Sequence, residues 1–277
     1  MHKKIYYING EFLPQSEAKI SFSDSAFLYG DGLFETIRFQ NNKLFAINKH
    51  LDRLKQGLKI LNFKYDKNND EIIKLLESLI QLNSIKHGLL RLIITRGDID
   101  GPVWEHEGKP NIYISINELI EEPKSPVKVI FVDEKDYPII RFSPAIKSMN
   151  YVGNMKAKKD ASAKGAFEPV FYNHNQIITE CAIRNIFFIK SNKLYTPSLD
   201  LGVLPGVMRD TIIEIGRNQQ LEICETHISF KSINDFDEAF ISSSGIGILE
   251  CYWAGWKSKY HLTKKIKKVL AEKLTNW

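Results

Sequence analysis

The sequence predicts an α+β protein of two domains, and three features of the chain support this. Strand-like apolar runs occur from the first residues to beyond residue 240, and amphipathic helical segments stand between them. The prolines of EEPKSP, residues 121–126, interrupt this pattern where a new strand-like run begins, so we predict a linker there. The predicted domains are a smaller N-terminal α/β domain, 1–120, and a larger C-terminal domain, 127–277, with mostly antiparallel strands.

The first domain is predicted to begin with two β-hairpins. KIYYING and EFLP flank Asn9-Gly10, a dipeptide typical of tight hairpin turns, and LFETIRF and KLFAIN flank QNN. Asn48 is predicted to cap a helix whose apolar positions follow the 3.6-residue period: Leu51, Leu54, Leu58 and Leu61. A second helix is predicted from Asp70 to about Leu82. The strands LLRLIIT and NIYISIN follow, with a long loop between them.

The second domain is predicted to mix strands and helices. Its first strand is VKVIFVD, and a helix follows from about Tyr151 to Lys164, ended by Gly165. The strands EPVFY, QIITE, NIFFIK and KLYTP come next, then a helix that opens at PGVMRDTIIEIG and the strand DEAFISSS. Apolar residues at helical spacing between Leu262 and Leu274 predict an amphipathic helix at the end.

The composition is that of an ordinary globular protein, with 43% hydrophobic and 26% charged residues among 277. The net charge of +5 arises in the last predicted helix, since residues 257–273 contain seven lysines and one acidic residue. We interpret these lysines as a solvated helix face, and the alternative is a basic nucleic-acid-binding module. No apolar run has the length of a membrane span, and no signal peptide or metal-ligand pattern is found. Three widely spaced cysteines fit reduced thiols, so we predict a cytoplasmic protein without nucleic-acid, membrane or metal partners.

Three features far apart in the sequence could bind an anion. A helix that begins at Pro205-Gly206 has outward-pointing first amides, and glycine lets a ligand approach the backbone closely. The segment SSSG, residues 242–245, ends a strand with hydroxyl groups. Arg53, beside an apolar stripe, can bind phosphate bidentately or cover the stripe with its stem. Each feature also has an explanation without a ligand, but together they predict a phosphate site.

Glu180 and Lys147 are the candidates for reactive chemistry. Glu180 lies between the strand-like runs QIIT and NIFFI, where a carboxylate needs a positive partner. This partner is either Arg184, in a salt bridge, or a protonated ring nitrogen of a cofactor; Glu180 can also be a plain turn residue. Lys147 precedes a predicted helix and offers a primary amine whose pKa a binding site can lower. The lysines within that helix are predicted to be surface charge: Lys156, Lys158, Lys159 and Lys164.

Six motifs occur in a characteristic order: YGDGLFET (29–36), HLDRL (50–54), IKSMNY (146–151), TECAIRNIFF (179–188), LPGVMRD (204–210) and DEAFISSS (237–244). In this order they resemble the class IV, or fold-type IV, pyridoxal-phosphate enzymes. That family includes branched-chain aminotransferases, D-amino-acid aminotransferases and aminodeoxychorismate lyase. The resemblance implies a two-domain, D-amino-acid aminotransferase-like α+β fold, pyridoxal 5'-phosphate as the cofactor, and a homodimer.

The resemblance also assigns roles to individual positions. Lys147 matches the lysine that forms a Schiff base with the cofactor, and Glu180 matches the carboxylate that keeps the ring nitrogen protonated. The other implied cofactor-binding residues are Arg53, Tyr151, Leu204, Val207, Met208, Ser243 and Ser244. Tyr151 stands one residue away from its usual spacing in the branched-chain subgroup. The candidate substrate-binding residues are Phe34, Arg38, Arg96 and Gly245, and Arg96 has the alternative role of anchoring its loop.

The substrate side of the motifs favours one activity within the family. Phe34 resembles the branched-chain subgroup, and the loop after TRG lacks the Arg-x-His pattern of D-amino-acid aminotransferases. We therefore predict an aminotransferase that passes the amino group of a branched-chain-like L-amino acid to a 2-oxo acid by a ping-pong Schiff-base mechanism. TEC and GVMR resemble aminodeoxychorismate lyase, so a lyase that releases pyruvate and 4-aminobenzoate is the alternative. The intact Lys147, Glu180 and Arg53 argue against a member without activity.

Overall fold

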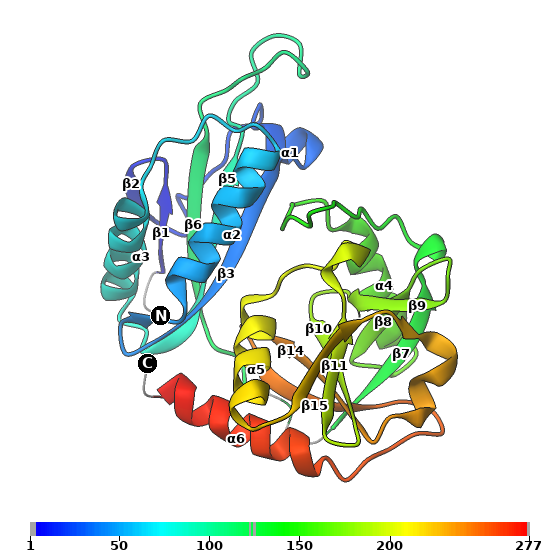
Figure 1. Ribbon diagram of the computed structural model, residues 1–277. Helices are drawn as coiled ribbons and strands as arrows, with labels where there is room; N and C mark the ends of the chain where they lie inside the picture. Colours follow the sequence, from blue (N-terminus) through cyan, green and yellow to red (C-terminus); the bar gives the residue numbers. More distant parts are fainter. Residues whose placement is uncertain (1–3, 122, 124–125, 276–277) are drawn as a thin grey trace. The chain divides into compact units, whose positions relative to one another are not determined.

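The computed structural model describes residues 4–121, 123 and 126–275, which divide into two compact units. The first unit contains residues 4–120 together with the short segment 146–150, and the second contains the other described residues. Both units contain strands and helices, so the predicted α+β class is confirmed (Figure 1). The predicted linker includes residues 122, 124 and 125, which lie outside the described residues, and its boundaries stay a prediction.

The first unit is an antiparallel sheet with helices packed on it. Along the sheet its strands are β2 (Glu11–Pro14), β1 (Ile5–Ile8), β6 (Asn111–Glu118), β5 (His87–Thr95), β3 (Gly32–Gln40) and β4 (Lys43–Leu44). Its helices are α1 (Ser25–Tyr29), α2 (Ile47–Ile60) and α3 (Asn69–Asn83). The longest strand pairing of this sheet joins all nine residues of β3 to β5.

Both predicted hairpins of this unit are confirmed. Asn9 and Gly10 connect β1 to β2 with φ of 47° and 112°, and Asn41 and Asn42 connect β3 to β4 with φ of 47° and 63°. Positive φ at both central residues is the geometry of tight hairpin turns, which asparagine and glycine tolerate. The predicted cap at Asn48 is wrong. The chain already turns at Ala46, with φ of 47°, and α2 begins at Ile47, so Asn48 lies inside the helix.

The core of the first unit lies between α2, α3 and one face of the sheet. Every second residue of β3 is buried on this face: Leu33, Glu35, Ile37 and Phe39. The predicted apolar positions of α2, Leu51, Leu54 and Leu58, are buried against it. Burial of one such aliphatic side chain contributes about 1.5–3 kcal/mol. Glu35 is the one charged residue in this otherwise apolar row. Its buried carboxylate therefore needs hydrogen-bonding or positively charged partners.

The second unit contains a larger, mixed sheet. Its strands are, in order along the sheet, β12 (Glu222–Thr226), β11 (Lys193–Pro197), β10 (Asn185–Lys190), β14 (Glu238–Ser243), β15 (Gly247–Tyr252), β7 (Val127–Asp133), β8 (Glu168–Tyr172), β9 (Ile177–Cys181) and β13 (Ile228–Ser229). Its helices are α4 (Val152–Ala163), α5 (Val207–Asn218) and α6 (His261–Thr275), with the short helices η1 (Glu134–Asp136), η2 (Leu199–Leu201) and η3 (Phe230–Asp235). The segments that contain α4 and α5 connect parallel neighbours, β7 to β8 and β11 to β12.

Strand β10 is buried on both faces, which explains its unbroken apolar sequence. Phe187 stacks on Phe240 of β14, with ring centroids 4.9 Å apart, on one face of the sheet. Phe188 points to the opposite face and packs near Phe236 and Trp253. Asn185, the first residue of β10, is paired with Ser242 near the end of β14, so the sheet places two polar side chains side by side.

Helix α6 is the predicted terminal amphipathic helix. Ile266, Leu270 and Leu274 are buried along one side of it, as the helical spacing predicts. Among the helices of the described residues, none combines the length and the hydropathy that crossing a membrane requires.

Candidate active site

Lys147 belongs to the first unit because its segment lies along β3. The Phe34 amide donates to the Lys147 carbonyl at 3.0 Å, and the Met149 amide donates to the Gly32 carbonyl at 2.9 Å. Two hydrogen bonds thus fix the backbone on both sides of Ser148. The predicted position of Lys147 outside the following helix is confirmed, since α4 begins at Val152.

The glycines of the motif YGDG make room for this segment. A Cβ atom at Gly32 would lie 2.8 Å from the Met149 sulfur, and one at Gly30 would lie 2.6 Å from Oδ1 of Asn150. Gly30 also has a φ of 70°, which disfavours any residue with a side chain. The motif is therefore explained by packing against the lysine segment.

The Lys147 amine lies beside an aromatic ring, and a second cation lies beside the same ring. Its Nζ is 4.4 Å from the centroid of the buried Phe34 ring. The guanidinium carbon of Arg91, on β5, is 4.0 Å from the same centroid. Arginine is well suited to bind carboxylates. Sequence reasoning missed Arg91, and the pairing of Thr36 with Arg91 in the sheet, which brings it beside Phe34, could not be known from the sequence.

A buried ionic cluster lies on the opposite face of β3. Glu35 is fully buried and accepts hydrogen bonds from Nε and Nη2 of Arg53 at 2.8 and 2.6 Å. Nδ1 of His50 lies 2.7 Å from the same carboxylate. The other ring nitrogen of His50, Nε2, is buried without a hydrogen-bond partner among the described residues. Arg53, the predicted phosphate ligand, thus uses two of its nitrogens to bind a protein carboxylate.

The partners of Glu35 decide its protonation state. Burial by itself would raise the pKa of Glu35, but Arg53 and His50 outweigh burial and lower the pKa to about 2. Burial lowers the pKa of His50, against the effect of Glu35, and the positive charges of Arg53 and Lys147 lower it further. The folded protein therefore contains an ionised Glu35 and a neutral His50.

The cluster predicts that acid destabilises the protein in two ranges of pH. Unfolded His50 binds a proton near pH 6.5 and folded His50 does not, so stability is lost as the pH falls below 6.5. Glu35 stabilises the fold above pH 4.5, and this contribution is lost as the pH falls from 4.5 towards 2, in total about 3 kcal/mol. Urea denaturation between pH 7.5 and 3 measures both ranges. His50→Gln should remove the slope near pH 6 and retain the slope below pH 4.5, and an unchanged profile would contradict this assignment.

Glu180 is held by an arginine that the sequence did not indicate. Nη1 of Arg141 bonds to Oε1 of Glu180, and the same guanidinium bonds to Glu134 and to the Thr179 hydroxyl. The Leu204 amide donates to Oε2 of Glu180 at 3.3 Å. Burial opposes the charge of Arg141, but Glu180 and Glu134 outweigh it and raise the pKa of Arg141. Arg141 therefore fixes the orientation of the Glu180 carboxylate.

The salt bridge from Glu180 to Arg184, one of the alternatives, is not formed. Arg184 instead bonds to Glu168, which is fully buried and also binds Lys158 at 2.7 Å. The interpretation of Lys158 as plain surface charge is therefore wrong. A buried carboxylate needs positive partners, and both cations neutralise Glu168 beneath α4.

Helix α5 begins with buried amides that no side chain caps among the described residues. Its N-cap is Gly206, and Val207 and Met208 of its first turn are 3% and 2% exposed. Such amides carry a partial positive charge and favour an anion. The predicted residues at the end of β14 are half-buried: Ser243, Ser244 and Gly245. The Ser242 hydroxyl, one residue earlier, is buried with no partner among the described residues.

Two of the candidate substrate residues differ from Phe34 in their positions. Arg38 is on the same face of β3 as Phe34 but four residues further, about 13 Å along the strand. Arg96 donates to both carboxylate oxygens of Asp31, at 2.7 and 3.2 Å, and to the Leu61 and Asn62 carbonyls. These contacts favour the anchoring alternative for Arg96. Tyr151, a predicted cofactor ligand, is half-buried and directly precedes α4.

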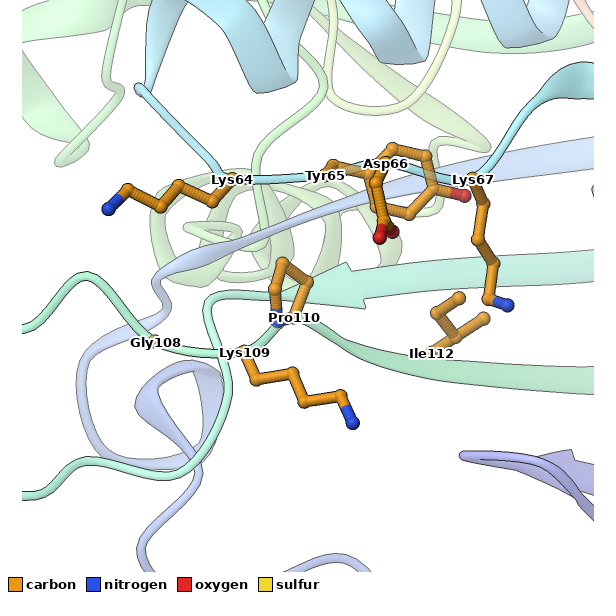
Figure 2. A pocket seen from close by; sticks show the side chains of 8 residues that line it. All are labelled: Lys64, Tyr65, Asp66, Lys67, Gly108, Lys109, Pro110 and Ile112. Atoms are coloured by element: carbon orange, nitrogen blue, oxygen red, sulfur yellow. The ribbon is translucent and has the colours of Figure 1, made fainter.

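A separate pocket in the first unit contains none of the predicted residues. It has a volume of about 300 Å³ and is lined by Lys64, Tyr65, Asp66, Lys67, Gly108, Lys109, Pro110 and Ile112 (Figure 2). Burial raises the pKa of Tyr65, and the charges of Glu71 and Asp66 raise it further, so the phenol stays protonated. Three of its lining residues are lysines, and Figure 2 shows the Lys67 side chain extending towards Ile112 and the Lys64 side chain pointing away from the other labelled side chains.

Comparison with known proteins identifies the family to which the chain belongs. The family model described as amino-transferase class IV matches residues 32–251. The chain belongs to the class IV aminotransferase family. It is therefore a pyridoxal-phosphate-dependent enzyme, as the six motifs predicted.

Individual relatives of this class IV aminotransferase include different activities. An aminodeoxychorismate lyase from Bacillus subtilis is 34% identical over 88% of this chain and 84% of the relative. A putative branched-chain-amino-acid aminotransferase from Methanocaldococcus jannaschii is 29% identical over 98% and 96%. The crystal structure of the Escherichia coli branched-chain amino acid aminotransferase has a TM-score of 0.88 at 23% identity, covering 98% and 94%. The predicted fold-type IV architecture is thus confirmed.

The residues of this class IV aminotransferase fit the chemistry of pyridoxal phosphate. Among the described residues, no side chain caps the first amides of α5 and none bonds to the Ser242 hydroxyl, so these groups can donate to a phosphate. A carboxylate accepts several hydrogen bonds, so Glu180 can accept one from a ring nitrogen besides those from Arg141 and Leu204. Lys147 has a primary amine that can react with the aldehyde.

Proposed function

We propose that this chain transfers the amino group of an L-amino acid with an apolar, branched-chain-like side chain to a 2-oxo acid. The observation that carries the proposal is the buried ring of Phe34, 4.4 Å from the Lys147 amine. An aromatic wall beside the reacting amine favours an apolar substrate side chain by direct contact and by keeping water out. Relatives named as branched-chain aminotransferases support the proposal.

The bound cofactor supplies an electron sink for the charge that remains when the substrate loses its Cα proton. Lys147 would hold the cofactor through its amine and would move the Cα proton of the substrate. Glu180 would accept a hydrogen bond from the protonated ring nitrogen, and Arg141 keeps its carboxylate in place. Arg91, at the Phe34 ring, binds a substrate carboxylate.

A panel of amino acids tests the proposal. The purified protein, saturated with pyridoxal phosphate, is given L-leucine, L-isoleucine, L-valine, L-aspartate or D-alanine, each with 2-oxoglutarate, and glutamate is measured. We expect the three apolar L-amino acids to react at least about tenfold faster than the other two, as expected for burial of a few methylene groups. Equal or faster reaction of D-alanine would contradict the proposal.

A lyase activity is the second candidate, favoured by the 34% identity to a relative named aminodeoxychorismate lyase. Early steps at Lys147 and Glu180 are common to both outcomes, so these residues do not discriminate between them. The same protein is therefore also given aminodeoxychorismate. Pyruvate and 4-aminobenzoate from this substrate, without glutamate from the panel, would replace the first proposal with the second.

Other expectations stay predictions. They are the homodimer, the cytoplasmic location, the absence of a nucleic-acid partner and the individual cofactor contacts of Arg53, Tyr151 and Ser244. Each follows from the resemblance or from the composition, and the amino acid panel does not depend on them.

A further inference from the structure

The turn before α5 is held by a side chain from the neighbouring strand. Asn185, the first residue of β10, is 7% exposed, and its Nδ2 donates to the Leu204 carbonyl at 3.0 Å. Its Oδ1 occupies the space beside Gly206, where a Cβ atom would lie only 2.0 Å away. Asn185 therefore contacts this turn at two points, one before and one after Pro205.

Gly206 is needed for space and not for its backbone conformation. Its φ of −67° and ψ of 131° are extended values that any residue adopts without strain. The interpretation that glycine lets a ligand approach the backbone is therefore incomplete, because the Asn185 amide already fills the side-chain position. After the Asn185 atoms, the next nearest atom to such a Cβ would be Cβ of Arg209, at 3.3 Å.

This contact sets the direction of the first amides of α5. Gly206 is the N-cap, and its carbonyl accepts from the Asp210 amide at 2.9 Å, which begins the helix. The same turn also contacts Glu180, the carboxylate predicted to bind the ring nitrogen of the cofactor, because the Leu204 amide donates to Glu180 at 3.3 Å. Because Asn185 is part of the sheet through its pairing with Ser242, the start of α5 is fixed to a rigid element.

We propose that Asn185 is a positioning residue for the cofactor phosphate: it orients the groups that bind the phosphate and does not contact the phosphate itself. By filling the space beside Gly206 and holding the Leu204 carbonyl, it aims the amides of Val207 and Met208 at the anion. The inference depends on the cofactor and not on the amino acid substrate proposed above. Its test therefore uses binding alone, so that a lyase activity or another substrate leaves it unaffected.

Binding of two forms of the cofactor distinguishes a positioning role of Asn185 from a general structural role. Apo-protein is titrated with pyridoxal phosphate and with pyridoxal, which lacks the phosphate, and the ratio of the two dissociation constants is measured. We expect Asn185→Ala to weaken binding of pyridoxal phosphate about tenfold, since a misaligned amide loses roughly one hydrogen bond to a charged group. Binding of pyridoxal should change less than about twofold. Equal weakening of both forms would overturn the proposal.

Asn173→Ala is the matched control. The Asn173 side chain also holds a turn of the second unit, accepting from the Asn175 and Ile177 amides at 3.0 and 3.1 Å. Its turn connects β8 to β9 and not to α5. We expect this variant to retain the ratio of the wild-type protein.

A double-mutant cycle tests the contact itself, and its Gly206→Ala single variant remains available where Asn185→Ala folds poorly. Gly206→Ala should weaken binding of pyridoxal phosphate in the wild-type background, because the new methyl group displaces the Asn185 amide. In the Asn185→Ala background the same change should have less than about twofold effect, since the space is then empty. Independent effects of the two changes, or a Gly206→Ala protein with the wild-type ratio, would overturn the proposal.

Discussion

Lys147→Ala is expected to abolish turnover, lowering the rate at least about 10³-fold, because no other group replaces the amine that moves the substrate proton. The variant should also lose the covalent attachment of the cofactor. Sodium borohydride should link pyridoxal phosphate irreversibly to the peptide that contains Lys147 in the wild-type protein and to no peptide in the variant. Absorbance spectra and mass spectrometry of the digested protein measure both effects.

Lys159→Ala is the control for this experiment. Lys159 is exposed on α4, 12 residues along the chain from Lys147, and we expect normal activity and normal labelling. Partial recovery of the Lys147→Ala activity by added methylamine would show that the missing group is an amine and that the variant is folded. Unchanged absorbance together with unchanged turnover in Lys147→Ala would contradict the proposed role of the Lys147 amine.

Glu35→Leu is expected to destabilise the protein by about 3–5 kcal/mol, because it leaves the Arg53 guanidinium and His50 without their carboxylate partner in a buried site. The expected effect is large because Arg53 is 9% exposed and cannot turn its charge into water. The free energy of unfolding in urea, measured on the apo-protein at pH 7.5, checks the value.

A second substitution distinguishes the lost ion pair from poor packing of leucine. Glu35→Leu with Arg53→Leu removes the unpaired charge as well, so part of the lost stability should return. Glu107→Ala breaks the exposed ion pair between Glu107 and Lys64 and should leave the unfolding transition unchanged. A double variant no more stable than Glu35→Leu alone would show that the charge of Arg53 is not the cause.

Local sequence signals predicted most elements of this fold. The Asn-Gly and Asn-Asn turns, the leucine spacing of α2 and the apolar run of β10 each depend on neighbours in the chain, so one sequence was sufficient. The start of α2 was predicted wrongly. The polar side chain of Asn48 suggested a cap, but the chain turns at Ala46, directly after the buried Phe45. The position of a buried side chain in the tertiary structure outweighed the local preference.

The candidate site was only partly predictable. Lys147, Glu180 and the start of α5 stand in ordered motifs, and these motifs identified the family and the cofactor. Arg91, Arg141 and Asn185 were missed, because each gains its importance from a partner that the sequence places far away. Arg141 and Glu180 are 39 residues apart, and Asn185 and Leu204 are 19 apart. Sequence spacing within one strand or helix cannot indicate such pairs.

By itself, the sequence determined the family and the cofactor and predicted the amine that reacts with it, because motif order and residue type are local properties of the chain. Only the tertiary structure decided which charges neutralise one another: Glu35 with Arg53, Glu180 with Arg141, and Glu168 with Arg184. A carboxylate enters the interior only when the fold brings a cation to it. The partners are therefore chosen by the packing of strands and helices, and no local pattern contains that choice.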